Sequence, residues 1–97
     1  MMIHMFAFRW KPAATARDKQ RAIAEVRAFA GVIPGLLEVH VGENIAERAN
    51  GYETGAVMKF TDAAALAAYQ VHPAHQALLA WLLPLIEPIE VDFLTSA

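Results

Sequence analysis

The residues most able to do chemistry in this 97-residue sequence are histidines, a tyrosine and a carboxylate. Tyr69 and His75 lie on either side of a His72-Pro73 step, His4 lies near the start of the chain and Asp92 near its end. A histidine titrates near neutral pH and suits proton transfer, whereas a tyrosine hydroxyl donates hydrogen bonds to a carbonyl or a developing enolate. Asp92 could accept a hydrogen bond from a ring N–H and fix its tautomer. We therefore expect acid–base chemistry in which the candidate catalytic residues are His75, Tyr69, Asp92 and His4.

The composition argues against most other kinds of site. There is no cysteine, and the only serine is Ser96, which excludes Cys–His catalysis and argues against a serine triad. Neither a P-loop nor a GxGxxG motif is present, so we expect no cofactor. The formal charge of -2 argues against a nucleic-acid partner. His72 and His75 could form half of a metal site, but Pro73 places His72 outside the regular helix, and we expect no bound metal.

Two further features concern partners outside the chain. The stretch from Ala63 to Ile86 carries no charge, but Pro73 and Pro84 divide it into short pieces. We therefore expect buried helices rather than a membrane span, and a cytoplasmic protein without a membrane partner. Six of the eight basic residues fall between Arg9 and Arg27, which could attract an anionic ligand. Because acidic residues are interleaved with them, we interpret this segment as a solvated helix face.

The hydrophobic pattern predicts the element order βαββαβ. Strands are expected at residues 3–10, 36–41, 54–60 and 89–94. The first helix is expected to follow Thr15, which with Asp18 resembles a capping box, and the second to follow Asp62 as its N-cap. The second helix should break at His72-Pro73, because the residue before a proline avoids the helical region. Its continuation places one stripe toward the sheet: His75, Leu78, Leu79, Leu82 and Leu85.

This order predicts an α+β, ferredoxin-like fold in a single domain over residues 1–97, with both helical segments on one face of a four-stranded antiparallel sheet. The first strand is nevertheless apolar on both faces, with Phe6 and Phe8 on one and Ile3 and Met5 on the other. An uncovered apolar face marks an association surface. We expect a symmetric homodimer that buries this sheet face against a second copy. The alternative is a solvated face with a few scattered apolar residues.

Several short segments carry a family resemblance. The opening IHMFAFRWK, the IPG turn, the GY pair, the YQVHPAHQ segment and the closing VDF resemble the Dabb family of stress-responsive dimeric α/β-barrel proteins, over essentially the whole chain. The resemblance implies a ferredoxin-like protomer and a homodimer formed by sheet-to-sheet packing, in agreement with the argument from the two apolar faces.

On function, the resemblance implies less, since most Dabb proteins have no established reaction. A plant branch typified by olivetolic acid cyclase uses a pocket histidine as general base and a tyrosine to polarise a carbonyl, and closes a polyketide chain by aldol condensation. Its tyrosine and base match Tyr69 and His75, and its histidine of the first strand and aspartate of the last match His4 and Asp92. Another pocket histidine of that branch falls near Thr54.

These observations lead to one expected function and two alternatives. The expected protein binds a small hydrophobic carbonyl compound between helices and sheet and acts on it by cofactor-free acid–base chemistry. Bulky Trp81 is expected to occupy space that an open tunnel would need. The first alternative is a non-catalytic stress or assembly protein whose core is filled by side chains. The second is a cofactor-free monooxygenase of the dimeric-barrel type.

Overall fold

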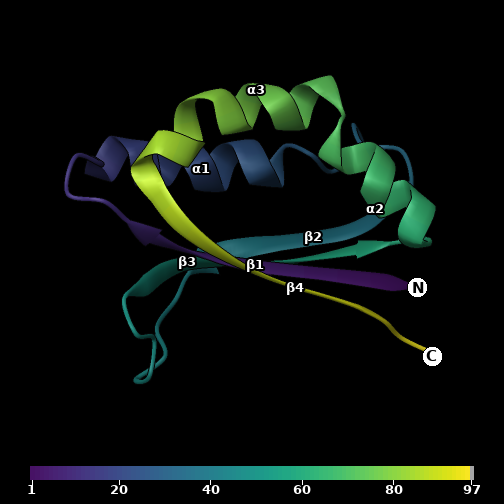
Figure 1. The fold of residues 1–97 in the computed structure, drawn as a ribbon, viewed down its shortest axis with the longest axis horizontal. Helices are drawn as coiled ribbons and strands as arrows, with labels where there is room; N and C mark the ends of the chain where they lie inside the picture. The colour runs from purple at the N-terminus through teal and green to yellow at the C-terminus, as the bar shows by residue number, and fades with distance from the viewer. Residues whose placement is uncertain (97) are drawn as a thin grey trace.

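The computed structural model describes residues 1–96, in which four strands form one antiparallel sheet beneath the helices (Figure 1). The strand order is β2-β3-β1-β4, so β2 and β4 are the edge strands. The predicted ferredoxin-like arrangement, with the helices on one face of the sheet, is confirmed. The elements are β1 (Met2–Trp10), α1 (Ala16–Arg27), β2 (Leu36–Glu43), β3 (Tyr52–Phe60), α2 (Ala63–Gln70), α3 (Pro73–Leu82), the 3₁₀ turn η1 (Leu83–Leu85) and β4 (Ile86–Leu94).

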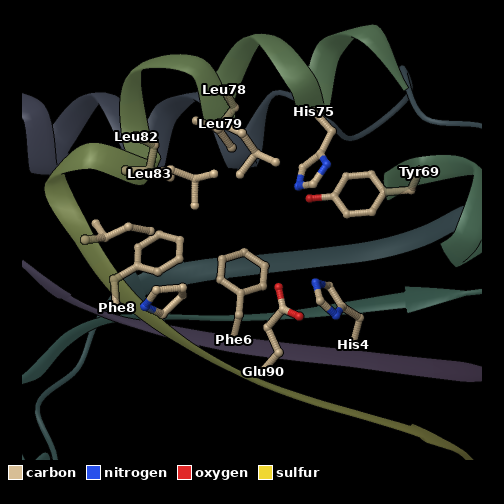
Figure 2. A pocket seen from close by; sticks show the side chains of 12 residues that line it. His4, Phe6, Phe8, Tyr69, His75, Leu78, Leu79, Leu82, Leu83 and Glu90 are labelled. Carbon is tan, nitrogen blue, oxygen red and sulfur yellow. The ribbon is translucent and has the colours of Figure 1, made fainter. Parts of the chain in front are cut away.

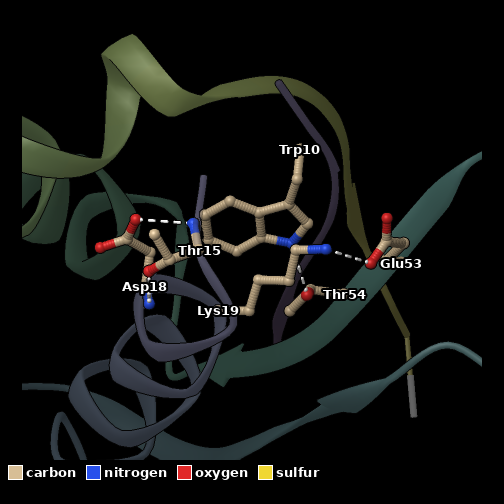
Figure 3. A network of polar contacts seen from close by, with 6 residues as sticks. All are labelled: Trp10, Thr15, Asp18, Lys19, Glu53 and Thr54. Atoms are coloured by element: carbon tan, nitrogen blue, oxygen red, sulfur yellow. Dashed lines mark hydrogen bonds and ion pairs between the residues drawn. The ribbon is translucent and has the colours of Figure 1, made fainter. Parts of the chain in front are cut away.

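Side-chain caps start the first two helices as the sequence predicts. At α1 the Asp18 N–H donates to Thr15 Oγ1 over 3.1 Å, and the Thr15 N–H donates to Asp18 Oδ2 over 2.9 Å (Figure 3). These hydrogen bonds favour the ionised carboxylate and hold the pKa of Asp18 below its ordinary value. At α2 the Ala65 N–H donates to Asp62 Oδ1 over 2.8 Å.

The strands differ from the predicted ranges at two places. β4 begins at Ile86 rather than Ile89, because η1 ends the helical segment and Pro88 is tolerated on an edge strand. In β2 the pairing register shifts between Leu36 and Glu38. The resulting bulge leaves Leu37 53% exposed, although strict alternation would place it on the inner face with Val39 and Val41, which pack against the core.

The main core lies between the helices and the inner face of the sheet, where the largest fully buried side chains are Phe60, Met58, Leu82 and Val26. No helix or strand among residues 1–96 covers the outer face (Figure 1). It carries apolar side chains that are between 38% and 50% exposed: Met5, Ile89, Val91 and Phe93. No helix among residues 1–96 is both long and apolar enough to cross a bilayer.

Candidate active site between the helix break and the sheet

The break between α2 and α3 brings Tyr69 and His75 together. In a continuous helix, residues six positions apart would point in directions that differ by roughly 120°, because each residue turns the helix by about 100°. Here Tyr69 lies in the last turn of α2 and His75 in the first turn of α3, and their ring centroids are 4.3 Å apart. The proline that stops the first helix therefore positions the two candidate residues side by side.

The histidine at the break determines which nitrogen of His75 carries the proton. His72 is the N-cap of α3, and its Nδ1 accepts the Ala74 N–H over 3.1 Å. In an unbroken helix that N–H would bond to the Gln70 carbonyl, four residues earlier. The Gln70 carbonyl instead accepts from His75 Nδ1 over 3.1 Å. Because a carbonyl only accepts, Nδ1 of neutral His75 carries the proton and Nε2 is left as a proton acceptor.

The surroundings hold His75 and Tyr69 in complementary protonation states. Burial lowers the pKa of His75, and the charge of His4 adds to this, against the opposing effects of the Gln70 hydrogen bond and the Glu90 carboxylate. Tyr69 is 2% exposed, and burial, followed by the Glu90 charge, raises the pKa of its hydroxyl well above the usual range. At neutral pH the site therefore places a neutral imidazole acceptor beside a protonated phenol donor.

Strand register pairs the other two candidates with each other. His4 on β1 lies directly opposite Asp92 on β4, and both side chains are on the inner face of the sheet. His4 Nδ1 donates to Asp92 Oδ1 over 2.5 Å, and the His4 ring is 4% exposed. Asp92 therefore orients His4 and makes no hydrogen bond to His75. The His4 ring centroid lies 6.0 Å from that of Tyr69, so His4 borders the same site.

Tyr69, His75 and His4 line one cavity of about 50 Å³ beneath α3 (Figure 2). Asp92 does not line it. The rest of the wall is mainly apolar and includes Phe6, Phe8, Leu78, Leu79, Leu82, Leu83, Ile86 and Pro88. Leu83, Pro88 and Glu90 are exposed, so the cavity opens between α3 and the edge strand β4. Its size accommodates a few waters, so an organic ligand requires exposed wall side chains such as Leu83 to move aside.

Glu90 is the wall residue that sequence reasoning missed. It lies opposite Phe6 in the β1–β4 register and two residues from Asp92, so alternation alone places it on the inner face. Alternation in the predicted strand 89–94 turns Glu90 and Asp92 to the same face, but only Asp92 was predicted as a site residue. The signal that could have identified Glu90 was this second carboxylate on the face that also carries His4. Within residues 1–96, Glu90 makes no hydrogen bond or ion pair with another side chain.

Two residues expected near the cavity lie elsewhere. Trp81 does not occupy the cavity, so that prediction is wrong: its Nε1–H donates to Glu25 Oε1 on α1 over 3.2 Å, and the Arg21 guanidinium lies 4.1 Å from its ring centroid. Thr54 on β3 accepts from Trp10 Nε1 over 2.9 Å (Figure 3). It lines a separate cavity of about 200 Å³ next to the ion pair between Lys19 and Glu53. Among the described residues no three potential metal ligands come together.

Comparison with known proteins decides the family. The model of the stress responsive A/B barrel domain, Dabb, matches residues 2–94. The chain belongs to the Dabb family. A search of the curated proteins gave no match, so the comparison does not extend to a reaction.

Three solved structures similar to this Dabb domain differ in the function that their descriptions give. A dimeric ferredoxin-like protein of unknown function from Jannaschia sp. CCS1 is 29% identical, with a TM-score of 0.82, over 97% of this chain and 98% of that one. Hydroxynitrile lyase from Passiflora edulis is 15% identical, with a TM-score of 0.85, over 99% and 94%. SnoaB, a cofactor-independent oxygenase from Streptomyces nogalater, is 17% identical, with a TM-score of 0.75, over 99% and 93%. At these low identities the last two structures show only that the fold is shared.

Proposed function

We propose that this Dabb domain binds a small hydrophobic carbonyl compound in the cavity beneath α3 and catalyses cofactor-free proton transfer on it. The observation that carries the proposal is that an unprotonated His75 Nε2 and a protonated Tyr69 hydroxyl border the same cavity. A side chain that only filled the core would not need a free acceptor and a free donor facing one space. The cavity therefore favours chemistry over the filled-core alternative.

In the proposed reaction His75 is the base and Tyr69 the electrophilic group. His75 Nε2 takes a proton from the carbon next to the carbonyl, and the electrons of that C–H bond move to form an enolate. The Tyr69 hydroxyl donates a hydrogen bond to the enolate oxygen, where the negative charge develops. The protonated His75 then returns the proton to the enolate carbon. In a lyase the enolate instead expels a group from the next carbon, and in a cyclase its carbon attacks a second carbonyl and forms a C–C bond; His75 then protonates the departing group or the new alkoxide. His4, held by Asp92, is an auxiliary at the border of the site.

The names of two structural neighbours support a catalytic use of the fold. One is called a hydroxynitrile lyase and the other a cofactor-independent oxygenase, and neither name implies a bound cofactor. Their identities to this chain are too low to transfer a substrate or a residue's role. The particular likeness to olivetolic acid cyclase and the cytoplasmic location stay predictions.

The proposed assembly is a homodimer in which the two sheets pack outer face to outer face. Half-exposed Ile89, Val91 and Phe93 on β4 continue across the register onto Met5 of β1. A shallow apolar hollow of about 130 Å³ is lined by Met5, Ile89 and Val91. Such a contiguous patch marks a contact surface. The neighbour from Jannaschia, at 29% identity, is called dimeric.

Hydrogen exchange at carbon tests the proposed chemistry without knowledge of the natural substrate. Butan-2-one in D₂O loses its protons next to the carbonyl through the enolate, and proton NMR follows the loss. We expect the wild-type protein to accelerate this exchange, and His75→Ala to reduce the protein-dependent rate by about 10²–10⁴-fold. Tyr69→Phe should also reduce it, because the ring stays in place while the donor is lost. His40→Ala is the matched control, because His40 is an exposed histidine on β2.

The possible results separate the hypotheses. Exchange that is no faster with the wild type than with His75→Ala would overturn the proposed chemistry. Equal losses in His75→Ala and His40→Ala would show that the imidazoles act only as dissolved buffer groups. Consumption of dissolved oxygen during the assay would instead support the monooxygenase alternative.

A further inference from the structure

The Glu90 carboxylate points into the end of the cavity that His4, Tyr69 and His75 form, although no side chain among residues 1–96 pairs with it there. Figure 2 shows it between Phe6 and His4, below the Tyr69 hydroxyl and the His75 ring. Its charge is close enough to raise the pKa of both Tyr69 and His75. The carboxylate therefore faces the groups that the proposed reaction uses.

Glu90 differs from the four acidic side chains that pair with a basic side chain of the protein. Glu25, Glu38 and Glu53 each accept a hydrogen bond from a basic side chain, and Asp92 accepts one from His4. Glu90 has no such donor within residues 1–96. In this it resembles the exposed Glu43, Glu47 and Glu87, but it lies in a cavity wall, between Phe6 and His4. An acceptor in this position is suited to a donor that arrives with the ligand.

We propose that Glu90 is a substrate-binding residue that accepts a hydrogen bond from a hydroxyl group of the ligand, while Tyr69 donates to the carbonyl of the same ligand. This inference rests on the proposed function and narrows its substrate class to compact hydroxy-carbonyl compounds. The donor of Tyr69 and the acceptor of Glu90 together select a molecule that carries both an acceptor and a donor on an apolar frame.

The chemistry of the cavity favours a hydroxyl over other groups. A carboxylic acid substrate would bring a second negative charge next to Glu90, and like charges repel. An ammonium group beside the exposed Glu90 would form an ion pair that solvent screens and that contributes little. It would also give up more hydration against Phe6 than a neutral hydroxyl does. A hydroxyl bound to a carboxylate makes a charge-assisted hydrogen bond, which is roughly twice as strong as a neutral one.

The test compares ligands that differ by one hydroxyl group. Butan-2-one, 3-hydroxybutan-2-one and 4-hydroxybutan-2-one are titrated into the wild-type protein while NMR follows the ring signals of Tyr69 and His75. We expect the better hydroxy ketone to bind about tenfold or more tightly than butan-2-one, as one hydrogen bond to a charged group would give. Glu90→Leu should abolish this preference, and Glu90→Gln should keep part of it. Glu47→Gln is the control, because it removes the same charge from the exposed loop between β2 and β3.

Each outcome bears on a different claim. A hydroxyl preference that is unchanged in Glu90→Leu, or absent from the wild type, would overturn the role of Glu90. If butan-2-one then still binds and Tyr69→Phe weakens that binding, the proposed function stands without this inference. If none of the three ketones perturbs the Tyr69 and His75 signals, the proposed function fails and the role of Glu90 fails with it. Loss of the preference in Glu47→Gln as well would show a general charge effect and would also refute the assignment.

Discussion

Replacement of His72 should change both the stability of the protein and the titration of His75. The His72 ring caps α3 by accepting the Ala74 N–H, and this leaves the Gln70 carbonyl to His75. Loss of an N-cap costs about 1 kcal/mol of the free energy of unfolding, within a range of about 0.5–2. For a domain of this size, 1 kcal/mol corresponds to a fall in melting temperature of roughly 4–8 °C. We expect His72→Ala to show a loss of this size in urea unfolding and in thermal unfolding.

The effect on His75 follows from its place in the first turn of α3. Without the cap this turn opens more readily, which weakens the hydrogen bond from His75 Nδ1 to the Gln70 carbonyl. Since that bond favours the protonated imidazole, its loss should lower the pKa of His75 further. NMR titration of the ring protons measures the change.

The matched variant is His72→Asn, which keeps a side-chain acceptor at the N-cap. It should retain most of the stability and a pKa of His75 close to that of the wild type. A His72→Ala variant with normal stability and an unchanged pKa of His75 would refute the reasoning. So would a His72→Asn variant that behaves like His72→Ala, because the cap would then not be what orients His75.

Three further predictions follow from the surface and the site. Val91→Glu should convert the proposed dimer to monomer in analytical ultracentrifugation, whereas Val71→Glu, at an exposed valine on the helical side, should not; dimers in both would refute the proposed interface. Because burial lowers the pKa of His75, the unfolded chain binds more protons at acidic pH. The contribution of His75 to stability should be complete above its ordinary pKa of about 6.5 and fall as the pH drops through the lower folded value. The exchange activity and the free energy of unfolding, both measured against pH, should therefore decline on the acid side, and His75→Ala should remove that step in stability. Asp92→Ala should lower the free energy of unfolding by about 1–3 kcal/mol, because it leaves the buried His4 N–H without an acceptor, and unchanged urea unfolding would contradict this.

The elements were predictable because their signals are local. Thr15 and Asp62 are short acceptors placed directly before helical patterns, and both act as caps. Pro73 ends one helix because its ring clashes with the preceding turn, and it starts the next because its fixed φ suits the first turn of a helix. The start of β4 was missed because Leu83–Leu85 continues the apolar pattern of α3, and periodicity does not distinguish a 3₁₀ turn from the end of an α-helix.

The site was only partly predictable, because side-chain direction depends on register and helix packing. Tyr69 and His75 lie close in sequence, and the break between them explains their contact. Asp92 was expected to orient a histidine, but only the β1–β4 register shows that the histidine is His4. Trp81 was misplaced because helix α3 has apolar residues around much of its surface, so that the pattern does not show which ones face α1.

The two faces of β4 couple the proposed dimer to the proposed site. Alternation along the strand puts Glu90 in the cavity wall and Val91 in the exposed patch, while hydrogen bonds hold the strand from one side only, through β1. A second copy packed on the outer face would therefore restrict a strand that forms one wall of the cavity. We expect Val91→Glu to weaken the binding of 4-hydroxybutan-2-one and to speed amide hydrogen exchange along β4 more than along the central strand β3. Unchanged affinity in a variant shown to be monomeric would mean that each protomer forms its cavity independently of the partner.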